Sequence, residues 1–184
     1  YAWGDVSKFQ AASEQGRGGL GTVNVKSAGN DNVDGNGDAL DASRFTVTVA
    51  AIGNNSTGHI ASYSTYGAHV LVSASAAAVT TDLLGNGAGY DGLENGDYTN
   101  VFGGTSAAGP VTAGVIALVL DANSGLGWRD VQNILAYSSV GVGSRYSAVT
   151  TNENSSWKWN GAQNWNGGGL HYSEDYGYGM VNAF

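Results

Sequence analysis

The segment Gly103-Gly104-Thr105-Ser106-Ala107-Ala108-Gly109-Pro110 runs directly into the most apolar stretch of the chain, residues 111–123. That stretch, Val-Thr-Ala-Gly-Val-Ile-Ala-Leu-Val-Leu-Asp-Ala-Asn, is apolar on nearly every side of a helix and predicts a helix buried in the middle of a domain. We expect Pro110 in its first turn, where a missing backbone N–H costs nothing. Gly125 is expected to end the helix. The sequence therefore places a turn of small residues against the buried centre of a fold.

Strands and further helices are predicted on both sides of this segment. Periodicity and turn residues predict strands at 22–27, 45–51 and 69–74, with a shorter one at 79–81, and helices at 5–14 and 128–138. The stretches 31–41, 84–96 and 144–169 are rich in Gly, Asn or Asp and predict loops. Buried-type strands around an apolar helix favour an α/β fold with a mostly parallel sheet.

Composition limits the possible partners of the chain. The 184 residues include 15 acids and 7 Lys or Arg, giving a net charge of −8, and no Cys. Such a chain has no electrostatic footprint for nucleic acid or an anionic membrane, and no disulfide or thiolate site. No apolar run is expected to reach the ~18 residues of a spanning helix. Residues 16–21 lack the Lys-Ser/Thr end of a P-loop, and we expect no organic cofactor.

Ser106 stands where the predicted helix begins. The positive end of the helix dipole and the free N–H groups there suit a nucleophilic serine, because they stabilise developing negative charge. The alternative is that Ser106 only caps the helix. Local sequence leaves both interpretations open.

Asn30 ends the strand segment Ser27-Ala28-Gly29-Asn30. The carboxyl ends of strands are where ligand groups gather in open α/β sheets, and an Asn amide there could donate a hydrogen bond to an oxyanion. The alternative is an Asx turn that opens the following loop. Both remain open from the residues alone.

Several motifs, taken in chain order, resemble the subtilisin-like serine proteases, and most closely their kexin/furin-like branch. They lie at residues 16–21, 27–30, 79–83, 104–110, 128–132 and 176–179, and the Gly-Thr-Ser-Ala-Ala-x-Pro signature at 104–110 is highly specific. The closing stretch 168–179 resembles secreted bacterial members. The resemblance implies a subtilisin-like three-layer fold with a mostly parallel sheet, present only in part.

The resemblance also implies roles for individual residues. Ser106 matches the catalytic serine, and Asn30 matches the asparagine that forms the oxyanion hole with the backbone N–H of Ser106. Gly104 and Thr105 match the neighbours that shape this hole. The P1 pocket of the substrate would be flanked by Ser27, Ala28 and Gly29.

Two aspartates are implied as further site residues. Asp38 resembles the aspartate that lines the P1 pocket and an adjacent structural calcium site, and Asp34 resembles its calcium-binding companion. The branch has a glutamate after the pair Tyr63-Ser64, where this chain has Thr65. Oxygen-rich loops suit calcium, but a plain polar loop remains the alternative.

The base and the carboxylate that a catalytic serine needs do not occur in the family's context. His59, His69 and His171 all fall outside the expected motifs. We therefore expect residues 1–184 to be the C-terminal part of a catalytic domain, with the aspartate and histidine upstream. Alone, the chain should expose a sheet edge and need its other half or a second copy of itself.

Two functions remain in play at this stage. The first is a secreted serine endopeptidase acting on polypeptides, and the second is a non-catalytic binding or structural module on a decayed protease fold. Trp157, Trp159 and Trp165 could form a platform for stacking sugars, although such aromatics more often cover a surface loop.

Overall fold

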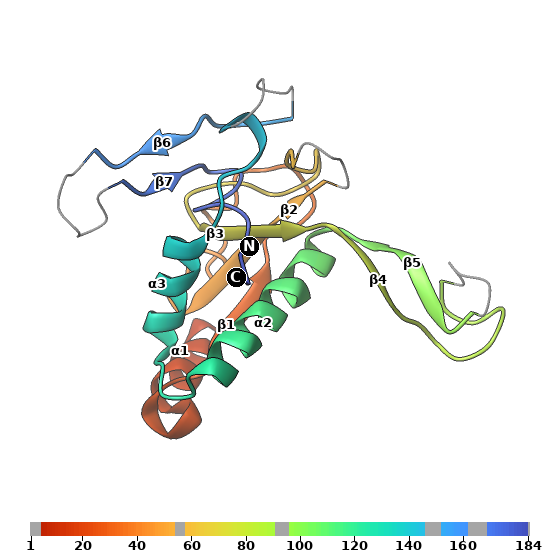
Figure 1. Ribbon diagram of the computed structural model, residues 1–184, viewed down its shortest axis with the longest axis horizontal. Coiled ribbons are helices and arrows are strands. Elements are labelled where there is room, and N and C mark those ends of the chain that lie inside the picture. Colours follow the sequence, from red (N-terminus) through yellow and green to blue (C-terminus); the bar gives the residue numbers. More distant parts are fainter. Residues whose placement is uncertain (1–4, 54–57, 91–95, 146–151, 162–168, 184) are drawn as a thin grey trace.

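Three parallel strands form the centre of the computed structural model, which describes residues 5–53, 58–90, 96–145, 152–161 and 169–183 (Figure 1). They are β1 (Asn24–Ser27), β2 (Thr46–Ile52) and β3 (Val70–Ser75), in the order β1-β2-β3. Val25 lies opposite Val47, and Val49 lies opposite Val72. The parallel sheet and the α/β class predicted from the sequence are confirmed.

Strand β2 is buried along its whole length because both of its faces are covered. Val47 and Val49 pack with Ala108, Ile116 and Leu135 of the helices. On the opposite face, the packed side chains come from the strands and from loop segments, namely Ala28, Ala50, Ile52, Ile60, Val70 and Tyr176. The core therefore lies on both sides of the sheet, with helices on one side and loops on the other.

Helix α2 (Thr105–Ala122) packs against all three strands. It begins six residues earlier than the sequence predicted, so Pro110 lies inside the helix rather than in its first turn. Thr105, Ala107 and Ala108 lie in the added first turn, and all three of these small residues are buried. The 18-residue helix is long and apolar enough to cross a membrane by length and composition, a test that core helices of soluble proteins also pass.

The flanking helices agree closely with the sequence prediction. Helix α1 (Val6–Gln15) begins after Asp5, whose side chain accepts a hydrogen bond from the N–H of Ser7, and a 3-10 turn (Gly16–Gly19) follows it. Helix α3 (Trp128–Ser138) has the predicted bounds, with Val131 and Leu135 buried. A second 3-10 turn lies at Gly143–Arg145. Amphipathic helices with clear end signals were thus predictable.

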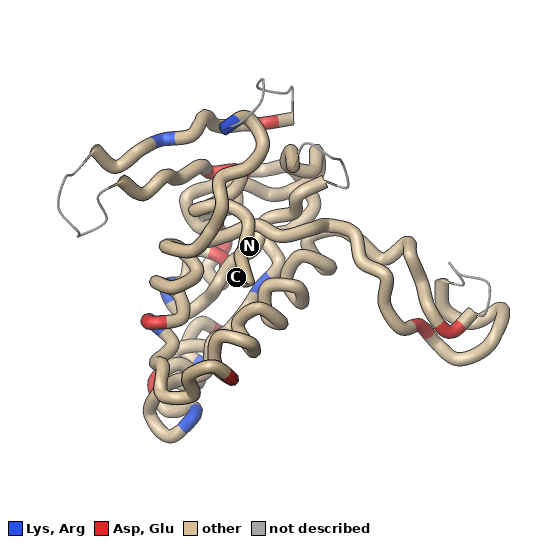
Figure 2. Tube along the Cα trace, viewed as in Figure 1, with Lys and Arg blue, Asp and Glu red and all other residues tan. Residues whose placement is uncertain are grey.

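Two antiparallel strand pairs lie outside the central sheet. Strands β4 (Ala77–Thr81) and β5 (Tyr98–Gly103) form an arm that projects from the body in Figure 1. Only acidic charges are marked on this arm in Figure 2, and the sequence 77–103 contains no Lys or Arg. Strands β6 (Lys158–Trp159) and β7 (His171–Tyr172) pair above the sheet. The sequence predicted loop over β6 and missed β5.

The outer side of β1 and one face of α2 are uncovered. Among the described residues β1 pairs only with β2, and all four of its residues are partly exposed. On α2, Val111 and Leu118 have exposed fractions of 39% and 61%. Helix α2 is therefore less buried than its apolar sequence predicted, because nothing described here covers this face.

Candidate active site

The end of β1 and the start of α2 meet through Asn30 and Thr105. Thr105 donates two hydrogen bonds to Oδ1 of Asn30, from its backbone N–H at 3.0 Å and from its hydroxyl at 2.9 Å. Since both donors approach the oxygen, the Nδ2 amide group of Asn30 is turned away from Thr105. Asn30 thus has a fixed side-chain orientation with two N–H bonds left to offer.

Ser106 lies next to this pair in the first turn of α2 and is exposed. Its backbone N–H and its hydroxyl make no hydrogen bond to any residue in the described part of the chain, whereas the N–H groups of Ala107 and Ala108 bond to the carbonyl of Gly104. A hollow of about 340 Å³ is lined by Asn30, Gly104 and Tyr63. The hollow is therefore lined by the Asn30 side chain and by Gly104, and the exposed Ser106 follows two residues after Gly104 in the chain.

Gly104 fits this place because it has no side chain. Its φ of 80° and ψ of −176° lie in a region that only glycine enters readily. A Cβ added there would stand 3.1 Å from Nδ2 of Asn30 and 3.3 Å from its Oδ1. The Asn30 amide packs directly on the Gly104 backbone, and any larger residue would displace it.

The segment Ser27-Ala28-Gly29 is joined to the same helix end. The Ser27 hydroxyl donates to the carbonyl of Thr105 at 2.7 Å, and the N–H of Gly29 donates to the Thr105 hydroxyl at 3.3 Å. Thr105 therefore makes hydrogen bonds with three residues at the end of β1. The structure thus joins Ser27, Gly29 and Asn30 to Thr105, the residue that precedes Ser106.

An acidic pocket of about 460 Å³ is partly lined by the same segment. Ala28, Gly29 and Thr65 line it together with four aspartates and one lysine, which are Asp31, Asp34, Asp38, Asp41 and Lys26. The predicted residues Asp34 and Asp38 are thus placed beside the strand, as expected. The sequence analysis missed Lys26 and Asp41, although Lys26 directly precedes the 27–29 segment.

The carboxylates of Asp34 and Asp38 accept hydrogen bonds from backbone N–H groups two or three residues further along the loop. Oδ1 of Asp34 accepts the N–H of Asn36, and Oδ1 of Asp38 accepts the N–H groups of Leu40 and Asp41. The hydrogen bond from Asp41 is the main reason why the pKa of Asp38 is lowered. No group of three His, Asp or Glu side chains that could hold a metal occurs in the described part of the chain. With Thr65 where the branch has an acid, this arrangement does not fit a calcium ion.

The three histidines have contacts away from Ser106. His59 is buried and its Nδ1 lies 3.4 Å from Glu153, while Nδ1 of His69 lies 3.5 Å from Oδ1 of Asn36. Burial lowers the pKa of His69 and of His171. Each histidine therefore has a structural environment that agrees with its lack of the family's catalytic context.

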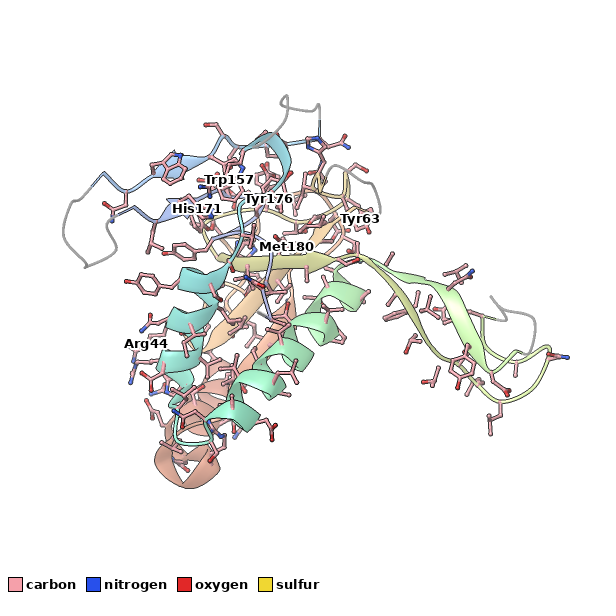
Figure 3. All side chains as sticks on the ribbon, viewed as in Figure 1. Arg44, Tyr63, Trp157, His171, Tyr176 and Met180 are labelled. Carbon is pink, nitrogen blue, oxygen red and sulfur yellow. The ribbon has the colours of Figure 1, made fainter. Side chains whose placement is uncertain are left out.

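Trp157 and Trp159, the two described tryptophans of the predicted sugar platform, contact other side chains. Trp157 stacks on the buried ring of Tyr176 at 5.4 Å and meets His171 edge-on, which Figure 3 shows beside β7. Trp159 is exposed, but the guanidinium of Arg145 lies 4.3 Å from its ring centre. Trp165 lies outside the described residues. The sugar-stacking interpretation is wrong for Trp157, which packs into the structure.

Comparison with known families decides what this site belongs to. The sequence profile described as "Subtilase family" matches residues 1–179. The chain belongs to the subtilase family. The resemblance to subtilisin-like proteases recognised from the motifs at 27–30 and 104–110 is thereby confirmed, and so is the fold class.

Relatives of this subtilase include proprotein-processing and bacterial enzymes. It is 33% identical over 187 residues to the PC3-like endoprotease variant B of Hydra vulgaris, covering 95% of this chain and 23% of that protein. It is 31% identical over 175 residues to kexin of Saccharomyces cerevisiae, covering 92% and 19%. It is 29% identical over 175 residues to an extracellular serine protease of Aeromonas sobria, covering 79% and 28%. The chain thus spans only 19% to 28% of the length of these relatives.

The fold is also found in solved structures. The serine protease of Aeromonas sobria superposes with a TM-score of 0.78 and 24% identity, over 96% of this subtilase chain and 37% of that chain. The complex of that protease with its chaperone ORF2 gives a TM-score of 0.76 at the same identity, over 95% and 37%. These matches support the subtilisin-like arrangement of helices and parallel strands.

Proposed function

We propose that this chain is the C-terminal part of the catalytic domain of a serine endopeptidase, with Ser106 as the nucleophile. The observation that supports this most is the double hydrogen bond from Thr105 to Oδ1 of Asn30. It turns Nδ2 of Asn30 away from Thr105, and the backbone N–H of the next residue, Ser106, makes no hydrogen bond to the described residues. Two donors next to a free serine hydroxyl are what an acyl-transfer enzyme needs.

In the proposed reaction, Oγ of Ser106 attacks the carbonyl carbon of a peptide bond. The carbonyl oxygen becomes an oxyanion that accepts hydrogen bonds from the Ser106 N–H and from Nδ2 of Asn30. The C–N bond then breaks, and the amine leaves with the proton that the base took from Ser106. Water attacks the resulting ester, releases the carboxylic acid and restores the serine hydroxyl.

The base and its orienting carboxylate are proposed to come from upstream of this chain. Residues 1–29 contain no histidine, whereas the family places its catalytic histidine before the asparagine that matches Asn30. The uncovered edge of β1 and the exposed face of α2 offer the surface for that missing half. A second copy of the chain is the alternative occupant. Residues 1–184 alone are expected to show almost no peptidase activity.

The substrate is proposed to be an extended polypeptide lying along residues 27–29, with its P1 side chain in the acidic pocket. Secretion is proposed because one relative, the Aeromonas sobria protease, is named an extracellular serine protease. The resemblance implies calcium at Asp34 and Asp38, which the donors present do not fit. Such an ion would require ligands beyond these two carboxylates.

Active-site labelling of the whole protein tests this proposal. A fluorophosphonate should modify Ser106, as located by mass spectrometry, and the Ser106→Ala variant should take no label. Asn30→Ala should slow labelling by roughly 10²–10³-fold, because one oxyanion donor is lost. Absence of label on Ser106, in a protein that carries the upstream histidine and aspartate, would instead favour a non-catalytic module on a decayed protease fold.

A further inference from the structure

The acidic pocket beside residues 27–29 contains a buried carboxylate that needs a cation. Asp41 is only 5% exposed, and a carboxylate is costly to bury without a partner. Burial raises the pKa of Asp41, and Lys26 opposes that rise. Asp31, Asp34 and Asp38 line the same pocket and add negative charge. A positively charged group near the Asp41 carboxylate would therefore stabilise its burial.

Lys26 supplies that positive group. Its Nζ lies 2.5 Å from Oδ1 of Asp41, and it also donates to the carbonyl of Ser27 at 3.2 Å. The hydrogen bond and the charge of this ammonium both oppose the rise in the pKa of Asp41, so the two side chains form a close ion pair. Lys26 is on β1 and Asp41 ends the loop 31–41, so the pair ties the loop to the strand.

The other titratable groups around the pocket do not replace Lys26. The charges of Asp41, Asp34 and Asp38 act to raise the pKa of the His69 imidazole. Burial has the larger effect and lowers that pKa, which disfavours the charged form of His69. Lys26 is the one cationic side chain among the residues that line the pocket. Lys26 is therefore the cationic side chain that the protein itself supplies to this pocket.

A divalent ion is poorly served by the same residues. Asp34 and Asp38 each give an oxygen to turns of their own loop, and Thr65 is buried against Gly29, where the kexin/furin-like branch has an acid. Calcium binds with six to eight oxygens, several of them usually carboxylates. The donors present here fall short of such a set.

We propose that the ammonium of Lys26 takes the place of a calcium ion as the structural cation of this pocket. It neutralises Asp41 and holds the loop 31–41 against β1. The wall of the P1 pocket then keeps its shape without a divalent metal at Asp34 and Asp38. This role does not depend on whether Ser106 is catalytic, since it concerns the stability of the loop.

Thermal unfolding of the whole protein tests the stability half of the proposal. Lys26→Met should lower Tm by roughly 5 °C, because it leaves the buried Asp41 carboxylate unpaired. The matched control Lys8→Met removes an exposed lysine, 4.0 Å from Asp5, and should leave Tm unchanged. Lys26→Met/Asp41→Asn should recover part of the loss, because the orphaned charge is gone.

These variants distinguish the loss of the Lys26–Asp41 ion pair from the general effect of removing a lysine. Equal Tm values for Lys26→Met and Lys8→Met would overturn the proposal. If Lys26→Met does not fold, the double variant decides. Folding of the double variant supports the ion pair, and its failure to fold overturns it.

Calorimetric titration with calcium chloride tests the other half. The whole protein and its Asp34→Asn/Asp38→Asn variant should bind the same number of calcium ions, even if other calcium sites exist elsewhere. Loss of one bound ion in the variant would show that calcium, and not Lys26, is the cation of this pocket. Neither measurement requires peptidase activity. A result that overturns the role of Lys26 is therefore distinct from a result that overturns the proposed function.

Discussion

Thr105 holds Oδ1 of Asn30 with two hydrogen bonds, one from its backbone N–H at 3.0 Å and one from its hydroxyl at 2.9 Å. This double contact joins the end of a parallel strand to the first residue of the central helix. It decides which end of the Asn30 amide is left free. The candidate oxyanion hole therefore depends on Thr105 as well as on the two donors themselves.

Thr105→Val removes the hydroxyl and keeps the backbone N–H, so it should loosen the Asn30 amide without abolishing the fold. The hydroxyl bonds to both Asn30 and Gly29, and we expect loss of the bond to Asn30, worth about 1 kcal/mol, to lower kcat roughly fivefold with KM little changed. Steady-state kinetics on a peptide substrate would measure this. Thr105→Ser keeps the hydroxyl and should restore kcat, and failure of that rescue would argue against the positioning role.

Gly104→Ala should damage the same site by a different route. The added Cβ would meet Nδ2 of Asn30 at 3.1 Å, at backbone angles that cost a non-glycine residue roughly 1–3 kcal/mol. We expect kcat to fall by roughly tenfold or more. Gly161→Ala is the control, since no described atom lies within 4 Å of the Cβ position there. Unchanged kinetics in Gly104→Ala would show that the Asn30 amide does not need this contact.

The uncovered face of α2 should make the isolated chain associate. Sedimentation velocity of residues 1–184 alone is expected to show species larger than a monomer, because Val111 and Leu118 are exposed beside an unpaired strand edge. Leu118→Glu should shift the distribution toward monomer. Leu83→Glu changes a leucine of similar exposure, 65%, outside this face, and should not. A monodisperse monomer for the unchanged chain would contradict the prediction.

Asp175 gives a prediction about pH. It is fully buried, and burial raises its pKa above that of the unfolded chain despite hydrogen bonds from Asn154 and Ser155. The folded state then binds more protons than the unfolded state from about pH 4 up to the raised pKa. Within that window the contribution of Asp175 to the free energy of unfolding falls as pH rises.

Urea unfolding of the whole protein and of Asp175→Asn, from pH 4 to pH 7, would measure that contribution. The difference in free energy between the two should change in the direction that favours Asp175→Asn as pH increases. Parallel pH curves for the two proteins would show that the pKa of Asp175 is the same in both states.

Much of this fold was predictable because its signals are local. The bounds of α3 follow from its amphipathic pattern, and the strands β1 to β3 follow from β-branched runs between turn residues. The start of α2 was not predictable in this way. Proline usually lies in the first turn of a helix, whereas Pro110 lies in the second turn of α2. Strands β5 and β7 each pair with the preceding strand across a long loop, and their own residues lack an unbroken run that marks a strand.

The site was predictable in its membership more than in its geometry. The motifs identified Asn30, Thr105 and Ser106, but the sequence could not show that Thr105 takes Oδ1 and leaves Nδ2 free. Nor could it show that Asp34 and Asp38 bond to their own turns, or that Lys26 reaches Asp41. Those facts depend on how side chains from separate segments meet in space.

The central claim is that Asn30 and the N–H of Ser106 together stabilise an oxyanion formed at Ser106. A crystal structure of the whole protein with a peptide phosphonate bound covalently to Ser106 tests it most directly. The account predicts that the phosphonyl oxygen lies about 2.7–3.1 Å from both Nδ2 of Asn30 and the backbone nitrogen of Ser106. A phosphonyl oxygen that points into solvent, with Asn30 turned away, would contradict it.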